Sequence, residues 1–123
     1  MEPKYSELWI ATENLNYEEV ERLLAAGHDP NEICPGGWPT LHQGIDAEAD
    51  GYNQTGYSDQ EDNPPSGRMV ELYLRAGANP YLQDTEGRDA FDFAGDRNVG
   101  YPYHAGALEV LARYGFKPRP QTD

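Results

Sequence analysis

Three carboxylates at alternate positions are the first residues of this sequence whose spacing could bind a metal ion. Asp46, Glu48 and Asp50 are separated by single alanines, and Gly51 follows them. This order matches the start of a calcium-binding loop, which has oxygen ligands at positions one, three and five and glycine at six. Position twelve, where such a loop has a bidentate Glu, is Tyr57. The internal repeat described below predicts a helix over these residues, and a helix is not a calcium-binding loop. A calcium-responsive accessory protein is therefore kept only as an alternative.

Residues that serve in nucleophilic or metal chemistry are few. Cys34 is the only cysteine, so an internal disulfide is excluded. His28 is expected in a turn and His104 in a loop, and no spacing favours either as the partner of a reactive thiol. The sequence has no zinc-ligand pattern, phosphate-binding glycine loop or Gly-x-Ser-x-Gly turn. We therefore expect a protein that is not an enzyme and that uses no cofactor or metal.

The charge is strongly negative and unevenly distributed. The 123 residues contain 22 acidic and 9 basic side chains, for a net charge of -13. Such a charge repels nucleic acid and anionic membranes and attracts a basic protein. No Lys or Arg lies between Leu23 and Gly67. The acidic residues of that segment are Asp29, Glu32, Asp46, Glu48, Asp50, Asp59, Glu61 and Asp62.

Length and composition predict one domain with a modest core, spanning residues 1–123. Hydrophobic residues make up 37% of the chain and aromatic residues 11%, which argues against general disorder. The first residues lack the basic and apolar segments of a secretory signal. No stretch approaches the roughly 20 apolar residues that a membrane span requires. We expect a cytoplasmic protein, with a monomer favoured.

Three Gly-x-x-Pro sequences reveal an internal repeat, beginning at Gly27, Gly77 and Gly115. Glycine closes a helix by adopting a left-handed conformation, and a proline soon afterwards prevents its continuation. Each glycine follows apolar residues at offsets of seven, four and three, which lie on one helical face. Those residues are Val20, Leu23, Leu24, Val70, Tyr73, Leu74, Leu108, Leu111 and Ala112. The clearest helix spans residues 16–26, where Asn16 and Glu19 are spaced for a reciprocal cap.

A second, shorter helix is expected before each of these. The three segments are Ser6–Glu13, Thr40 to about Ala49, and Asp89 to about Asp96. One helix pair cannot bury its apolar face alone, so three pairs must stack on one another. The sequence therefore predicts an all-α solenoid of three helix pairs, with repeats at about 5–36, 37–86 and 87–118.

These motifs resemble the ankyrin repeat. The run GWPTLH at Gly37–His42 is similar to the G-x-T-P-L-H opening, with Thr and Pro transposed, and GRDAFDFA at Gly87–Ala94 is similar to the variant G-x-T-A-L-D-x-A. Leu23–Asn31 and Leu72–Pro80 resemble the closing motif L-L-x-x-G-A-D-P-N. The likeness covers roughly residues 5–118, although the first repeat lacks the opening motif. It implies a structural hydrogen bond from His42 between repeats.

Two insertions enlarge the repeats beyond the ankyrin period of about 33 residues. The closing glycines are 50 and then 38 residues apart, and the extra residues lie at Gly51–Gly67 and Arg97–His104. Equivalent positions of stacked repeats share one edge, so the two loops should emerge side by side. They contain Tyr52, Tyr57, Tyr101 and Tyr103, and tyrosine is enriched at binding surfaces. Inert surface insertions are the alternative.

The resemblance implies a second surface, the concave side formed by the first helices and the hairpin tips. Its residues here would be Trp38, Asp46, Glu48, Asp50, Asp84, Glu86, Asp89, Asp92 and Asp96. A solvated acidic face is the simpler account of any one of them. With Asp59, Glu61 and Asp62 in the first insertion, they predict binding of a basic protein. The resemblance extends to small acidic immunity proteins of bacterial toxin systems, so the basic partner could be a toxin; a generic adaptor is the runner-up.

Overall fold

Side-chain caps fix where the first helices begin. In the computed structural model, which describes residues 5–54, 67–95 and 104–118, Ser6 Oγ accepts the Trp9 N–H at 3.0 Å. Asn16 Oδ1 accepts the Glu19 N–H at 3.3 Å. The helices are α1 (Glu7–Glu13), α2 (Tyr17–Ala25), α3 (Thr40–Gln54), α4 (Arg68–Arg75), α5 (Ala90–Gly95) and α6 (Ala105–Arg113). The described ranges contain no strand beyond an isolated bridge, so the all-α prediction is confirmed.

The predicted helix bounds hold with small corrections. The expected reciprocal cap at α2 forms only in one direction, because the Glu19 carboxylate pairs with Arg22 and the Asn16 N–H donates to the Ala11 carbonyl at 2.9 Å. The helix expected to end near Ala49 continues to Gln54, so the first insertion begins as extra turns of α3.

The three closing glycines adopt the predicted left-handed conformation. Their φ angles are +104° at Gly27, +96° at Gly77 and +87° at Gly115. After Gly27, the His28 N–H donates to the Leu23 carbonyl at 3.1 Å, and equivalent bonds close α4 and α6 at 3.0 Å. The three helices therefore end by one shared mechanism.

The apolar face of the second helices is confirmed for α2 and α4. Buried residues there include Val20, Leu23, Leu24, Val70, Tyr73 and Leu74. In α6 the prediction is partly wrong, because Leu108 is half-buried and Ala112 is exposed. The buried stripe instead runs through Ala107, Val110 and Leu111, which are spaced three and one residues apart on the side of α6 that meets the core.

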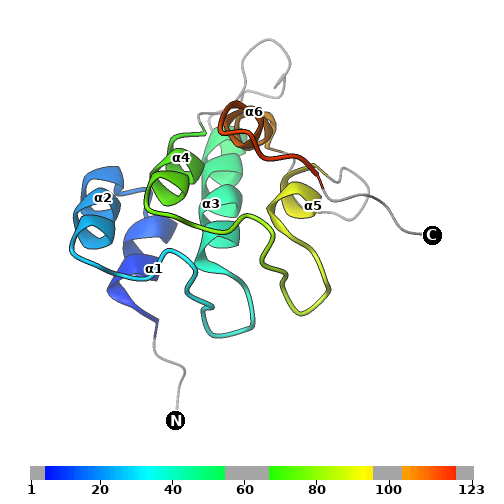
Figure 1. The fold of residues 1–123 in the computed structure, drawn as a ribbon. Coiled ribbons are helices and arrows are strands. Elements are labelled where there is room, and N and C mark those ends of the chain that lie inside the picture. Colours follow the sequence, from blue (N-terminus) through cyan, green and yellow to red (C-terminus); the bar gives the residue numbers. More distant parts are fainter. Residues whose placement is uncertain (1–4, 55–66, 96–103, 119–123) are drawn as a thin grey trace.

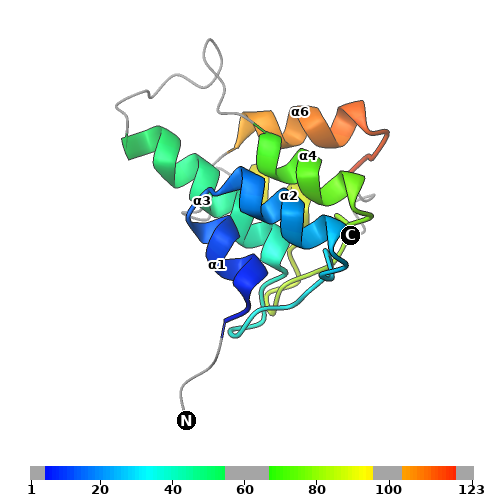
Figure 2. The same cartoon turned by 90° about the vertical axis from the view of Figure 1, so that its left-hand side faces the viewer.

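The helices form two layers of three. Helices α1, α3 and α5 follow one another in the first layer, and α2, α4 and α6 in the second. Each helix also contacts its partner across the layers, giving the pairs α1 with α2, α3 with α4 and α5 with α6. Figures 1 and 2 show this stack, with the α1 and α2 pair at one end. Most of the core lies between the layers.

The turns after α2 and α4 repeat the same hydrogen bonds fifty residues apart. Asp29 Oδ1 accepts the Asn31 N–H at 2.8 Å, and Asn79 Oδ1 accepts the Tyr81 N–H at 2.9 Å. The Asn79 N–H also donates to Asn31 Oδ1 at 2.6 Å. The two turns are therefore alike in geometry and are bonded directly to each other.

His42 forms the expected hydrogen bond between repeats. Its Nε2 lies 2.9 Å from the Arg88 carbonyl oxygen, and its side chain is buried. A carbonyl only accepts, so Nε2 carries a proton and donates it to this oxygen. Burial lowers the pKa of His42 below its ordinary value, more than the nearby carbonyl and carboxylates raise it.

This shift makes folding sensitive to mild acid. The unfolded chain binds a proton at His42 near pH 6.5, whereas the folded chain resists it, so the free energy of unfolding should fall as the pH drops below that value. From pH 7.5 to 5.5, we expect the wild type to lose about 1 kcal/mol more stability than His42→Gln, which keeps a donor for the carbonyl. Urea unfolding at each pH measures this. An equal dependence of the unfolding free energy on pH in wild type and His42→Gln would contradict this prediction.

Gly67, at the start of α4, packs directly against α6. A Cβ built there would lie 2.5 Å from the Gly106 carbonyl oxygen and 2.5 Å from Val110 Cγ2. Its φ of −89° suits any residue, so glycine is needed here for close approach and not for its backbone freedom.

Gly67→Ala should therefore destabilise the fold by overpacking, by about 2 to 3 kcal/mol. Gly77→Ala is the matched control, because a Cβ there meets nothing within 4 Å and only the positive φ is strained, at a cost of about 1 kcal/mol. Urea denaturation compares the two. An equal or smaller loss for Gly67→Ala would show that α6 moves aside freely.

Candidate interaction surfaces

A buried carboxylate joins the parts of the chain that border the two insertions. Glu48, on α3, accepts the Tyr17 hydroxyl at 2.7 Å and the Met69 N–H at 3.2 Å, both at Oε2. Its Oε1 lies 3.0 Å from His104 Nε2. The side chains of Glu48 and His104 are 2% and 0% exposed. One carboxylate therefore binds groups from α2, α4 and the residue before α6.

The hydrogen bonds of His104 define its tautomer. His104 Nδ1 accepts the Ala107 N–H at 3.1 Å and so caps the N-terminus of α6. An Nδ1 that accepts carries no proton, so Nε2 holds the proton and donates it to the Glu48 carboxylate. The neutral ring thus joins the cap of one helix to a charge on another. His104 lies outside the helices, directly before α6, as expected, but this cap and the Glu48 carboxylate hold its side chain in the interior.

Tyr17 is a second member of this cluster that the sequence did not indicate. Burial, together with the adjacent Glu48 carboxylate, raises the pKa of its hydroxyl far above the ordinary value. The Arg68 guanidinium lies 4.5 Å from the centre of its ring. Tyr17 stays protonated and therefore acts only as a hydrogen-bond donor to the carboxylate.

The described ends of the two insertions lie together. Gly67, which ends the first insertion, is packed on Gly106, and His104, which ends the second, is bound to Glu48. The His104 N–H donates to the Ala94 carbonyl at 2.9 Å, which fixes the exit of the second insertion against the end of α5. The residues at which the two insertions end therefore lie close together in the fold.

The acidic residues expected on α3 have different environments. The prediction that Asp46, Glu48 and Asp50 lie on a helix is confirmed, because all three fall within α3. Asp46 is half-buried, and Asp50 is described only by its backbone. Glu48 was expected on an open acidic face but is buried, because it is the acceptor for three internal donors.

Asp89 and Asp92 form a reciprocal cap at the start of α5. The Asp89 N–H donates to Asp92 Oδ2 at 3.2 Å, and the Asp92 N–H donates to Asp89 Oδ1 at 3.0 Å. This capping box stabilises the first turn of a short helix. Asp89 is 1% exposed, so the expectation that it faces a partner is corrected, whereas Asp92 is exposed.

Asp84 is likewise a structural residue, in the hairpin before α5. Its Oδ1 accepts the N–H groups of Glu86 and Arg88, and its Oδ2 lies 3.1 Å from Arg88 Nε. Burial alone would raise the pKa of this carboxyl, but these donors and the guanidinium lower it below its usual range. Asp84 is therefore a charged hydrogen-bond acceptor that holds the hairpin together.

Trp38 lies in the hairpin before α3 and is half-buried. Its ring meets Phe93 edge to face, with centroids 5.0 Å apart. Its carbonyl accepts the Cys34 N–H at 2.8 Å and lies 3.1 Å from Cys34 Sγ. Burial raises the pKa of the Cys34 thiol despite these bonds, which opposes formation of a nucleophilic thiolate.

Several predicted contact residues lie outside the described part of the chain. For Tyr52, only the backbone within α3 is described. The remaining predicted contact residues outside the described ranges are Tyr57, Asp59, Glu61, Asp62, Asp96, Tyr101 and Tyr103.

Within the described ranges, no three His, Cys, Asp or Glu side chains are grouped so that they could hold a metal ion. The same ranges contain no helix with the length and apolar character needed to cross a membrane.

Comparison with known proteins identifies no relative. No protein-family model matches the sequence, and no curated protein matches it significantly. Arguments about function therefore depend on the geometry and charge of this chain.

The Glu48 cluster makes a direct prediction about stability. Glutamine has one acceptor oxygen where glutamate has two, so Glu48→Gln leaves a buried donor unpaired and should lower the free energy of unfolding by about 2 to 3 kcal/mol. Glu109→Gln, on the exposed face of α6, is the matched control and should change it by less than about 0.5 kcal/mol. Urea unfolding measures both. Equal stability of the two variants would show that the cluster contributes nothing to the fold.

Proposed function

We propose that this chain is a short ankyrin-type repeat protein that binds and neutralises a basic protein, such as a toxin. It acts as a monomer in the cytoplasm, without catalysis, cofactor, nucleic acid or membrane. The observation that carries the proposal is the acidic excess, with 22 acidic against 9 basic residues and no Lys or Arg between Leu23 and Gly67. An anionic field of this size speeds encounter with a basic partner.

The architecture supports the ankyrin part of the proposal. Helix pairs stack in two layers, and the turns at Asn31 and Asn79 are bonded to each other. His42 donates across to the hairpin of the next repeat, as the ankyrin resemblance implies. Stacked repeats of this kind present extended surfaces to partners and do not enclose a substrate.

The internal ion pairs support the electrostatic part. Arg22 pairs with Glu19, Arg113 with Glu71, and Arg88 with both Asp84 and Glu86. These arginines are therefore already neutralised within the chain. The exposed carboxylates outside these pairs, such as Glu7, remain available to a positively charged partner.

The shared anchor of the two insertions supports a contact surface there. The Glu48 cluster and the Gly67 contact hold the ends of both insertions at one edge of the stack. The insertions supply Tyr57, Tyr101 and Tyr103 together with the acidic run Asp59–Asp62. Tyrosines surrounded by charge are typical of protein-binding surfaces, where aromatic residues supply most of the contact energy.

A generic adaptor, which tethers its partner without inhibiting it, is the alternative that the same architecture favours. An inhibitor and an adaptor differ in what they do to the partner's activity. An inhibitor abolishes that activity at a one-to-one ratio, whereas an adaptor leaves it intact.

The first test is affinity capture of host proteins on the tagged chain, eluted in steps of rising salt and identified by mass spectrometry. We expect one predominant basic protein that salt releases, and loss of that protein's activity when the purified pair is mixed. Many weak partners, or none at any salt, would contradict a dedicated inhibitor. Intact activity of a captured partner would favour the adaptor.

A matched pair of triple variants then measures the contribution of the acidic insertion to association. Asp59→Asn, Glu61→Gln and Asp62→Asn together should slow association with that partner about tenfold at 50 mM salt. The control removes three exposed carboxylates elsewhere, by Glu13→Gln, Glu21→Gln and Glu109→Gln. Stopped-flow kinetics compares the rates, and equal rates for the two variants would exclude a specific role for the insertion.

A further inference from the structure

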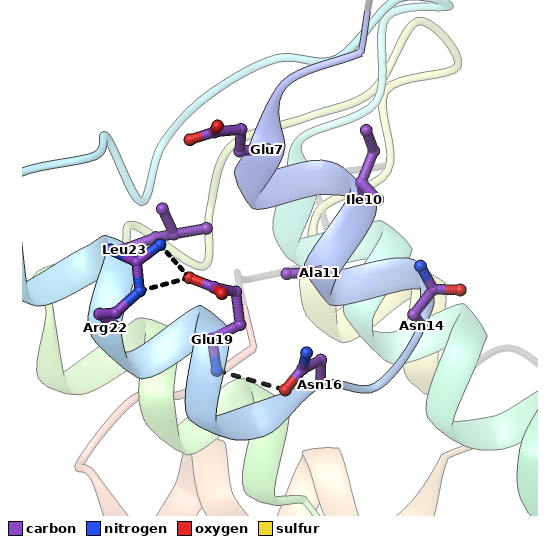
Figure 3. A pocket seen from close by; sticks show the side chains of 8 residues that line it. All are labelled: Glu7, Ile10, Ala11, Asn14, Asn16, Glu19, Arg22 and Leu23. Carbon is purple, nitrogen blue, oxygen red and sulfur yellow. Dashed lines mark hydrogen bonds and ion pairs between the residues drawn. The ribbon is translucent and has the colours of Figure 1, made fainter.

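The end of the stack formed by α1 and α2 carries a groove that the predicted surfaces do not include. It has a volume of about 250 Å³ and lies between the two helices. Figure 3 shows its residues on α1 and α2, with the other helices behind them. The residues that line it are Glu7, Ile10, Ala11, Asn14, Asn16, Glu19, Arg22 and Leu23.

The groove has an apolar floor and an apolar side. Ala11 and Leu23 form its buried base, at 6% and 2% exposure. Ile10 stands at its side and is 48% exposed, one of the most exposed large hydrophobic side chains in the described ranges. Covering exposed apolar area of this kind with a partner side chain lowers the free energy of the complex.

The rim of the groove is negatively charged. Glu7 is exposed at one end, and its carboxylate makes no hydrogen bond or ion pair with another residue of the described ranges. Glu19 lies on the opposite helix and is bonded to Arg22, the only basic residue in the lining. The groove thus suits a side chain with an aliphatic stem and a cationic head, which lays its stem on apolar surface and its charge beside a carboxylate.

The position of the groove explains why it is open. Helix α1 packs on α3, and α2 packs on α4, so this pair has a neighbouring pair on one side only. A stacked array normally buries such a face against another helical unit. Each copy of this face carries Glu7 and Glu19 against one basic residue, Arg22, and each chain has a net charge of -13, so like charges oppose association of two copies.

We propose that the α1–α2 groove is a docking site for an amphipathic basic helix of the protein partner. An apolar side chain of that helix covers Ile10 and Leu23, and an arginine or lysine of the same helix reaches Glu7. This inference rests on the proposed function, because it assumes a basic partner. It adds a contact surface at the end of the stack, separate from the anchored insertions.

A synthetic peptide tests the groove without knowledge of the partner. The probe is a 14-residue amidated helix with Leu and Arg on one face and Ala and Gln elsewhere. Two control peptides carry citrulline in place of every Arg or Ser in place of every Leu. In a ¹⁵N NMR titration at 50 mM salt, we expect shifted amide signals to concentrate in α1 and α2 with the probe, and both control peptides to bind more weakly.

Two pairs of variants make the test specific. Ile10→Ser should raise the Kd of the probe about fivefold, because the probe no longer buries the exposed half of an isoleucine side chain. Ile33→Ser is its match, since Ile33 is 51% exposed outside the groove, and should change the Kd less than twofold. Glu7→Gln should raise the Kd about threefold and weaken its salt dependence, whereas Glu109→Gln should leave both nearly unchanged.

Three results would overturn the proposal. Shifts spread over the whole acidic surface would mean that the peptide binds by charge alone. Equal effects of Ile10→Ser and Ile33→Ser would exclude the groove. Sedimentation showing a wild-type dimer that Ile10→Ser dissociates would assign the groove to a second copy.

The groove and the proposed function can fail separately. If a captured basic partner binds the Ile10→Ser and Glu7→Gln variants as tightly as the wild type, the function stands and the groove is wrong. If no basic partner is captured but the peptide still localises to α1 and α2, the groove stands and the proposed function is wrong.

Discussion

The Glu48 carboxylate is the interaction on which the arrangement of this chain depends. Two oxygens on α3 accept from Tyr17, Met69 and His104, and the same His104 caps α6. Burying a carboxylate costs free energy unless its oxygens are hydrogen-bonded. The fold must therefore bring all three donors to Glu48 to offset the cost of burying its charge. This requirement joins all three helix pairs next to the residues at which the two insertions end.

The acidic residues of the described ranges therefore include two classes with different roles. Glu48, Asp84 and Asp89 are inside, where they cap helices or accept hydrogen bonds. Exposed carboxylates such as Glu7 and Asp92 contribute to the field that a basic partner would meet. The net charge alone does not separate the classes, although only the second is accessible for recognition. The same division explains why a strongly acidic chain can still form an ordered core.

Local signals in the sequence predicted most of the helices. The left-handed glycines, the cap at Asn16 and the apolar faces of α2 and α4 all act within one turn or one helix. Their physics depends on residues three to seven positions apart, so they are visible in the chain itself. The helix ends were predicted less accurately, since α3 continues through Gly51 to Gln54, past its expected end near Ala49.

The sequence by itself determined an all-α chain of repeated helix pairs, the two insertions and the excess of negative charge. Tertiary structure decided which carboxylates are buried, that His104 is an interior cap, and that the end groove stays open beside Ile10. Glu48 and His104 are 56 residues apart, and their meeting depends on how the pairs stack. Burial of a polar side chain is a property of its neighbours in space, and residue type and spacing do not identify those neighbours.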